Sequence, residues 1–406
     1  MFTDFIINEG DRNVGTGEVG EIMQGMRFDP GLLRPYVKKD GRRYVTINTG
    51  RMKFDKASKS YKPVYVERSV GECIQNGITS PVFNATQSLR KLEWEMLEGA
   101  VLLESRKRLR AWSDLAAASS FNVPGMSKTI LEHETMSDPG SAVVDMDALT
   151  DAPADAPKYQ LEGLPLPIIH SDFSFHQRQM AISRNSGQGV DLRMAEAAGR
   201  RVGEMVEQIL IGTTAGMTYG GGSSAPTYGR TSKVYGYTNF TNRNSYTSVT
   251  TPTGANPQST VSNVLAMIDL LRADNFFGPF MLYHSNDWDQ YMDNDYAFTN
   301  GSNWAANPGM TLRDRLRKID GIMDVRRLDW WTPVNSAGAS VPYQLLLVQM
   351  NSEVARAVIG MDITTVQWDV KGGLQTNFKV MCIMVPQLRA TYSGNCGICH
   401  GSTTAL

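Results

Sequence analysis

The sequence predicts an α+β fold, and three stretches of the chain indicate it. Two short β-prone runs, Tyr44–Ile47 and Pro63–Val66, lie among Gly and Lys residues in the first part of the chain. A helical period begins at Thr86, where apolar residues recur at spacings of three and four. A second long amphipathic helix is expected over residues 190–211. The length of 406 residues allows two or three domains or one elaborate domain.

Composition and charge limit the classes of function. With 41% hydrophobic and 20% charged residues, the chain has an ordinary soluble composition. Its formal net charge of -1 argues against a general nucleic-acid binder, which would be strongly basic. The first residues carry neither a basic leader nor an apolar segment, and no run of about 18 uncharged apolar residues occurs. We therefore expect a protein that stays in the cytoplasm and has no membrane partner.

The first 83 residues are interpreted as an extended arm with a basic stretch. Between Arg34 and Arg68 there are eleven Lys or Arg residues against three Asp or Glu. Such a stretch is typical of a solvated strand pair, or of an arm that lies on an acidic partner.

The helix that begins at Thr86 is expected to be capped by that residue and to end before Pro124-Gly125. One apolar stripe consists of Leu89, Leu92, Met96, Ala100 and Leu103, and beside it lie Trp94, Leu97 and Val101.

Residues 129–157 contain seven acidic residues and no Lys or Arg. The turn signal Asp138-Pro139-Gly140 lies between β-prone flanks. This stretch therefore predicts a long projecting hairpin rather than packed core.

The helix over residues 190–211 is expected to begin with Asp191 as its cap. Its predicted apolar stripe consists of Met194, Ala198, Val202, Met205 and Ile209.

Near its end the chain carries Cys396-Gly-Ile-Cys399-His400, the spacing of covalent haem attachment. A structural zinc site and a redox dithiol are further alternatives, but a second pair of ligands and a following helix are both missing from the pattern. The flanking glycines and small polar residues favour loose terminal chain with reduced thiols. We therefore expect neither haem nor metal. The thiols could still cross-link subunits in oxidising surroundings.

No motif indicates an enzyme. There is no GxSxG nucleophile elbow, and Gly216–Gly222 lacks the Gly-Lys-Ser/Thr ending of a phosphate-binding loop. We therefore assign no catalytic residue, cofactor or metal ligand.

The run from Glu162 to Gly212 carries a family resemblance. Pro165-Leu-Pro167, His170-Ser-Asp172-Phe173 and Arg178, followed by the long helix, resemble the encapsulin-like shell proteins. Those proteins share the major capsid fold of tailed phages that is named after coliphage Hong Kong 97.

The resemblance continues in order through the rest of the chain and covers roughly residues 84–392. A helix near residues 260–292, a Gly-Pro with an apolar strand, "GMTLRDRLRKIDGIMDVRRLDWW" and two closing strand regions resemble successive elements of the family. The resemblance implies a Hong Kong 97-type subunit with a long spine helix. The implied parts are an N-terminal arm (1–83), an N-terminal helix (84–124), an extended loop (125–165), a peripheral domain (166–255 and 344–395), an axial domain (256–343) and a tail (396–406).

The long arm and the Gly-rich loop at 213–255 depart from compartment shells and favour a phage or prophage major capsid protein. Such a protein assembles with itself, as hexamers and pentamers of an icosahedral head, in the host bacterial cytoplasm. It encloses double-stranded DNA, and portal, scaffold or cement proteins are further possible partners. An encapsulin-type nanocompartment is the alternative, and a thiol or haem redox protein is a third hypothesis from another class.

Because the arm and the hairpin carry opposite charge, we expect them to meet between subunits, with DNA as the other partner for the arm. The candidate residues on the arm are Arg34, Lys38, Lys39, Arg42, Arg43, Lys53 and Lys56. The candidate residues on the hairpin are Glu132, Glu134, Asp138, Asp145 and Asp147.

Overall fold

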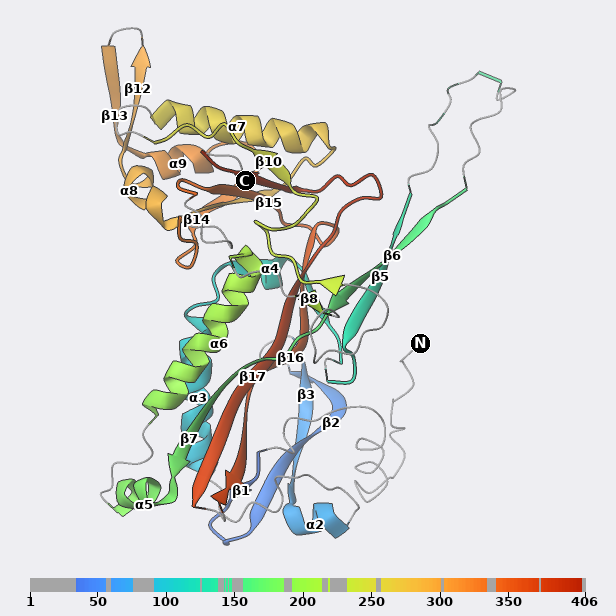
Figure 1. Ribbon diagram of the computed structural model, residues 1–406, viewed down its shortest axis with the longest axis vertical. Helices are drawn as coiled ribbons and strands as arrows, with labels where there is room; N and C mark the ends of the chain where they lie inside the picture. Colours follow the sequence, from blue (N-terminus) through green and yellow to red (C-terminus); the bar gives the residue numbers. More distant parts are fainter. Residues whose placement is uncertain are drawn as a thin grey trace.

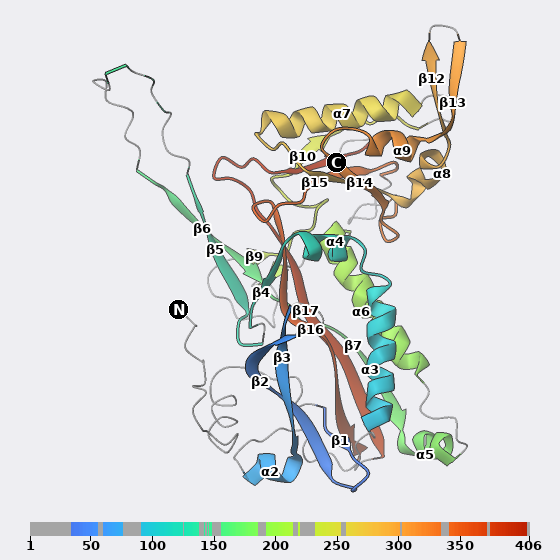
Figure 2. The ribbon, with the colours of Figure 1, turned by 180° about the vertical axis from the view of Figure 1, so that it is seen from behind.

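The computed structural model confirms the α+β class and arranges the chain as two stacked sheet-and-helix bodies with projecting ribbons (Figures 1 and 2). The structure describes residues 34–55, 60–75, 91–124, 126–137, 142, 144, 146–147, 156–185, 192–213, 218–219, 232–252, 257–300, 303–333, 341–371 and 374–403. Within these ranges no helix is both long and apolar enough to cross a bilayer.

The lower body is a four-stranded sheet with two long helices on it (Figure 1). In sheet order its strands are β4 (Ser120–Asn122), β16 (Ala355–Val370), β17 (Gln375–Leu388) and β7 (Ile169–His176). The helices are α3 (Lys91–Arg106) and α6 (Arg193–Ile211), and shorter helices α4 (Ala111–Ala118) and α5 (Gln177–Asn185) lie near their ends. The closing strands and the long spine helix that the sequence predicted are therefore confirmed.

The spine helix α6 buries Ala198, Val202 and Ile209 of the predicted stripe, and the other two residues of that stripe lie outside the buried face. Met194 and Met205 are exposed, whereas Ala195, Gly199, Gly203 and a run of aliphatic residues are buried. The reason is close packing on α3, because only small residues allow two helix backbones to approach each other. The helix ends at Gly212, whose φ of 91° is the left-handed conformation of a helix C-cap. The predicted cap Asp191 lies outside the described residues.

Helix α3 buries the stripe that contains Trp94 and exposes the stripe that contains Leu92. Trp94, Leu97 and Val101 are buried, whereas Leu92, Met96 and Leu103 are exposed by 72%, 57% and 60%. Both stripes have helical spacing, so the period alone does not choose between them. Thr86, the predicted cap, lies outside the described residues.

The upper body is a five-stranded sheet covered on one face by α7 (Pro257–Ala273) (Figure 1). Its strands in sheet order are β10 (Asn244–Tyr246), β18 (Ile398–Gly401), β15 (Leu345–Gln349), β11 (Phe280–His284) and β14 (Ile322–Arg327). The short elements η3 (Asn286–Trp288), α8 (Asp289–Met292) and α9 (Leu312–Arg317) lie at one end. Alternate residues of β11 face the two cores, so that Phe280 and Leu282 meet α7 while Met281 and Tyr283 belong to the lower core.

The prediction of a loose tail is wrong. Strand β18 lies inside the upper sheet, parallel to β10 and antiparallel to β15, and all four of its residues are buried. Strand β15 pairs with β11, so residues 345–349 also belong to the upper sheet, although the predicted division had placed them in the peripheral domain. The reason is that two inner strands of this five-stranded sheet, β18 and β15, come from parts of the chain that are distant in sequence from β10, β11 and β14.

Three ribbons leave the two bodies. The arm ribbon comprises β1 (Tyr36–Val37), β2 (Arg43–Asp55) and β3 (Ser60–Ser69), followed by α2 (Val70–Gln75). The acidic hairpin comprises β5 (Ile130–Met136) and β6 (Tyr159–Pro165), and the upper ribbon comprises β12 (Asp295–Asn300) and β13 (Asn303–Thr311). The small pair β8 (Thr218–Tyr219) and β9 (Ser232–Lys233) completes the strands. Figures 1 and 2 show the acidic hairpin and the upper ribbon extending beyond the bodies. A projecting hairpin is therefore confirmed, although its second strand, β6, lies after the predicted range of residues 129–157.

Candidate assembly surfaces

The root of the arm is anchored on the lower body. Arg34 donates a hydrogen bond from Nε to the carbonyl oxygen of Thr365 at 3.0 Å and pairs with Glu98 of α3 at 2.5 Å. The indole nitrogen of Trp94 donates to the carbonyl oxygen of Pro35 at 3.1 Å. The root of the arm therefore lies beside β16 at Thr365, beyond residues 357–359, where β16 pairs with β4.

The arm ribbon is held to α3 through one carboxylate. Glu67 on β3 pairs with Lys38 at 2.5 Å and with Lys91 at 2.8 Å, and it accepts a hydrogen bond from the Tyr36 hydroxyl at 2.7 Å. These hydrogen bonds, of which that from Lys38 has the largest effect, lower the pKa of Glu67 to about 2. Burial raises the pKa of Tyr36 to about 12.

The seven arm candidates therefore fall into different environments. Arg34 and Lys38 are engaged inside the chain, as just described, and Arg43 also has an interaction. Lys39, Arg42 and Lys53 are exposed. Lys56 lies outside the described residues.

The acidic hairpin presents its carboxylates to solvent. Glu132 and Glu134 are exposed on β5. Asp147 is exposed as well and takes part in an interaction, whereas Asp138 and Asp145 lie outside the described residues. The predicted contact between the hairpin and the arm of a neighbouring subunit remains a prediction.

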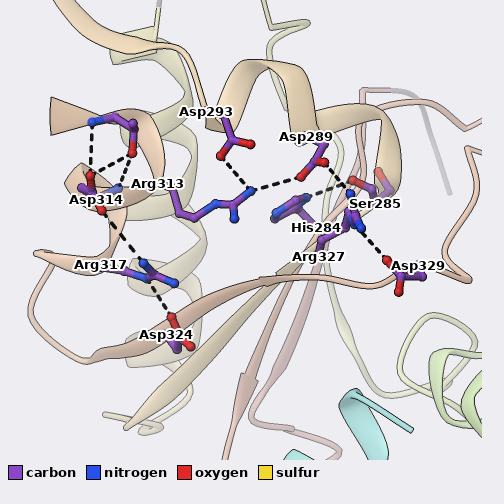
Figure 3. Close-up of polar contacts among 11 residues, drawn as sticks. His284, Ser285, Asp289, Asp293, Arg313, Asp314, Arg317, Asp324, Arg327 and Asp329 are labelled. Carbon is purple, nitrogen blue, oxygen red and sulfur yellow. Dashed lines mark hydrogen bonds and ion pairs between the residues drawn. The ribbon is translucent and has the colours of Figure 1, made fainter. Parts of the chain in front are cut away.

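A network of ion pairs surrounds the foot of the upper ribbon (Figure 3). Asp289, the first residue of α8, pairs with Arg313 of α9 at 3.1 Å and with Arg327 of β14 at 2.5 Å. Arg313 also pairs with Asp293 at 3.1 Å, and Arg327 with Asp329 at 2.9 Å. The network holds α8, α9 and β14 together where the ribbon begins.

The start of α9 is fixed by a capping box. Thr311, the last residue of β13, accepts a hydrogen bond from the backbone of Asp314 while the Asp314 side chain accepts one from the Thr311 backbone (Figure 3). This capping box therefore fixes the position at which β13 ends and α9 begins.

A second group of polar contacts joins the two bodies through α4. The Tyr283 hydroxyl of β11 donates to Asp114 of α4 at 3.0 Å, and Arg326 of β14 pairs with the same carboxylate. Arg110, just before α4, pairs with Asp329 at 3.4 Å. On the other side of α4, the Glu207 side chain of α6 accepts hydrogen bonds from the first two backbone amides of α4.

Glu207 and Asp289 were not among the candidate residues predicted from the sequence. A signal for Glu207 was present, because this carboxylate falls on the apolar side of the spine helix between Val206 and Ile209. A lone charge on a buried stripe indicates a specific partner. Asp289 carried no such signal, since its arginine partners are distant in sequence.

The cysteines near the end of the chain are buried and structural. Burial raises the pKa values of the Cys396 and Cys399 thiols to about 12, so thiolate is scarce near neutral pH. Burial also lowers the pKa of His400 to about 3, and its Nε2 lies 3.0 Å from the side-chain oxygen of Gln344. Among the described residues, no group of three His, Cys, Asp or Glu side chains is arranged to hold a metal ion.

Several solved structures are similar to this chain. A virus-like particle from Pyrococcus furiosus is 14% identical, with 75% of this chain and 98% of that chain covered at a TM-score of 0.48. The capsid of Myoviridae phage XM1 is 10% identical, with 70% and 89% covered at a TM-score of 0.47. The capsid of a native GTA particle is 12% identical, with 74% and 91% covered at a TM-score of 0.47. No curated protein matches this sequence.

One family model matches most of the chain. It is described as a family of unknown function, DUF6260, and it matches residues 84–401. The match begins ahead of α3 and extends through β18, so it includes both bodies and excludes the arm. The chain therefore belongs to the family of unknown function DUF6260.

Proposed function

We propose that this chain is the subunit of a closed shell of the Hong Kong 97 type, and that the shell is a phage or prophage head enclosing double-stranded DNA. The observation that carries the proposal is the set of ribbons that leave the two bodies. A two-stranded ribbon is marginally stable alone in water, and its outer edges expose unpaired backbone groups. A neighbouring copy of the chain can cover these edges.

Charge supports contacts between copies. The arm ribbon exposes Lys39, Arg42 and Lys53, and the acidic hairpin exposes Glu132 and Glu134. Opposite charge on two extensions orients the approach of a neighbour, although each exposed pair contributes only about 0 to 1 kcal/mol. Repetition around a closed shell makes these contacts collectively important for register.

The domain division follows from the same proposal, with one change from the sequence-based version. The lower body, built on α6, is assigned as the peripheral domain, and the upper body as the axial domain. Residues 345–349 and 398–401 move to the axial domain because they are strands of its sheet. Hexamers and pentamers would form from the same subunit in the bacterial cytoplasm, with portal, scaffold or cement proteins as additional partners.

Expression of the chain in bacteria, followed by electron microscopy and nuclease treatment, tests the function. We expect closed shells, and we expect particles from the native source to protect double-stranded DNA from nuclease. A chain that stays monomeric under all conditions of salt and concentration would contradict the proposed shell.

A second candidate is a protein-only compartment, which one specific observation favours. The outward stripe of α3, made of Leu92, Met96 and Leu103, is an exposed apolar surface on a long helix. Such a surface fits an apolar partner inside a shell better than it fits phosphate groups. Native particles that carry protein and no nucleic acid would support this candidate over the phage head.

A further inference from the structure

The geometry points to a binding site for an oxyanion, either a phosphate or a carboxylate, where the acidic hairpin leaves the lower body. The site consists of Arg356 and Arg389 at the end of the β16 and β17 pair and of His133 on β5. We call it the hairpin-foot site. It is separate from the ion-pair network of Figure 3 and from the contacts through α4.

The register of β16 and β17 brings the two arginines together. Ala355 lies opposite Leu388, and the backbone N–H of Arg389 donates to the carbonyl oxygen of Val354 at 2.9 Å. Arg356 and Arg389 are therefore diagonal neighbours on one face of the strand pair, a separation that long side chains can span. Adjacent like charges on a sheet are destabilising unless a counter-charge lies between them.

The described part of the chain provides no such counter-charge at ion-pair distance from either guanidinium. Arg356 donates from Nε to the carbonyl oxygen of Ser352 at 2.6 Å, and the Nε of Arg389 is buried without an acceptor. Burial first, and then the positive Arg356, lower the pKa of Arg389. The carboxylates of Glu353 and Glu162 act on Arg389 from farther away and offset this only in part.

His133 adds a third donor from the hairpin. It lies on the same face of β5 as the buried Leu131, so it faces the lower body. Its side chain is 15% exposed, and neither ring nitrogen makes a hydrogen bond, although Nε2 lies 3.4 Å from the Glu162 carboxylate. Burial is the main cause that lowers the pKa of His133, and Glu162 opposes it. Arg389 and Arg356 lower this pKa as well, because both lie close enough to act on the ring.

The chemistry of these three side chains fits an oxyanion. A guanidinium has five N–H donors and no acceptor, and its planar fork matches the two oxygens of a carboxylate or phosphate. An imidazole contributes an N–H donor in either protonation state. An oxyanion between the two arginines would remove their repulsion and satisfy the buried Nε of Arg389. Because a guanidinium cannot act as a metal ligand, the site does not suit a cation.

Two sources can supply the oxyanion. One is free phosphate from solution. The other is a carboxylate of a second copy, since Glu132 and Glu134 are exposed on a hairpin that extends beyond the bodies (Figures 1 and 2). In their own chain these two residues alternate with His133 along β5 and therefore point away from the hairpin-foot site. The second source rests on the proposed function, whereas the site itself does not.

Thermal unfolding of the full, unassembled chain tests the site, with inorganic phosphate as the probe and chloride of equal ionic strength as the reference. Phosphate strengthens apolar burial in any protein, so the difference between variants is the measure. About 50 mM phosphate should raise the Tm of the wild type by about 2 °C or more beyond its effect on Arg389→Gln. Arg201→Gln, at an exposed position of α6, should respond like the wild type. Equal responses of wild type and Arg389→Gln would overturn the site.

The same variants separate an anion site from a purely structural arginine. In chloride, Arg389→Gln should unfold at the wild-type temperature or above it, because the substitution removes a repulsive neighbour of Arg356. A variant that unfolds far below the wild type, or does not fold, would overturn the proposal, since Arg389 would then hold the fold. Arg356→Lys keeps the charge but not the fork, so it should lose most of the response to phosphate. A full response in this variant would contradict forked binding.

Shell formation in the two buffers, followed by light scattering, distinguishes the sources. If a second copy supplies a carboxylate, phosphate competes with it, so wild-type shells should form less readily in phosphate than in chloride of equal ionic strength. Arg389→Gln should then assemble poorly in both buffers. If free phosphate is the ligand, it should favour wild-type assembly or leave it unchanged. The thermal measurement needs no shells, so an absence of shells would count against the proposed function and not against the site.

Discussion

The spine and the arm lie against the same helix, α3, and are held to it by opposite kinds of contact. Between α3 and α6 the backbones approach so closely that a methyl group added at Gly203 would lie 2.7 Å from the carbonyl oxygen of Ser105. The root of the arm is buried against α3, where Trp94 donates to the carbonyl oxygen of Pro35, whereas the rest of the arm ribbon contacts α3 through ion pairs near the surface, such as that of Glu67 with Lys91. The packing of α6 on α3 therefore tolerates little added volume, whereas beyond its buried root the arm is held by ion pairs that contacts with another chain could replace.

Under the proposed function, this difference separates the contacts that fold the chain from those that assemble it. Interiors packed to crystal-like density tolerate no added volume, whereas exposed ion pairs contribute little and are screened by salt. We expect substitutions in the spine to change the free energy of unfolding, and substitutions in the arm to change assembly. Variants of the two regions test this separation, from the largest expected effect on the free energy of unfolding to the smallest.

Gly203→Ala should give the largest loss. The added methyl meets the backbone of α3, which cannot move aside without displacing the whole helix, so we expect a destabilisation of about 1–3 kcal/mol in urea unfolding. The matched control is Gly99→Ala on α3, where nothing lies within 4 Å of the added methyl. Because alanine favours helix, the control should be neutral or stabilising by up to about 1 kcal/mol. Equal losses in both variants would contradict close packing as the cause.

Cys399→Ser tests whether the end of the chain behaves as part of the body. The thiol is fully buried in the core under α7, so a hydroxyl in its place should destabilise the chain by about 1–3 kcal/mol in thermal unfolding. In the native wild type, Cys396 and Cys399 should resist thiol reagents at neutral pH, and particles should run as monomers on non-reducing gels. Rapid labelling of either cysteine without denaturant would refute the buried strand.

Glu67→Gln should have a smaller effect that depends on pH. Because hydrogen bonds from Lys38, Lys91 and Tyr36 lower the pKa of Glu67 from 4.5 to about 2, its contribution to stability is present above about pH 4.5 and is lost as the pH falls towards 2. The side chain is partly exposed, so the effect at neutral pH should stay within about 1 kcal/mol. Wild type and variant should therefore converge in acid, and a difference that grows on acidification would contradict this role.

The double variant Lys39→Glu, Arg42→Glu should leave the subunit nearly unchanged. Both side chains are exposed on the arm, so unfolding should shift by no more than about 0.5 kcal/mol. Shell formation should nevertheless weaken, with a changed dependence on salt, in light scattering and electron microscopy. Lys318→Glu, at an exposed position on the upper body, is the control for a charge reversal outside the arm. Shells that form normally from the arm variant at every ionic strength would leave DNA as the partner of the arm.

Local pattern in the sequence was sufficient to predict the elements whose signals are local. The β-prone runs of the arm, the acidic hairpin around β5 and β6, the spine helix and the strands after Gly278-Pro279 all have their cause in neighbouring residues. Alternation, turn residues and helical period act over a few positions, so a single chain read in order contains them.

What only the tertiary structure decided is which surfaces those elements bury. Helix α3 offers two apolar stripes of similar quality, and the one with Trp94 faces inward because its indole meets Phe378 and the arm root. Near the end of the chain, Gly397 and Gly401 indicated looseness, yet both are packing positions where a methyl group would meet Val354 or Met267 at under 3 Å. Glu207 and Asp114 lie far apart in sequence and meet only through α4. Burial is a property of two surfaces at once, and one of them is always elsewhere in the chain.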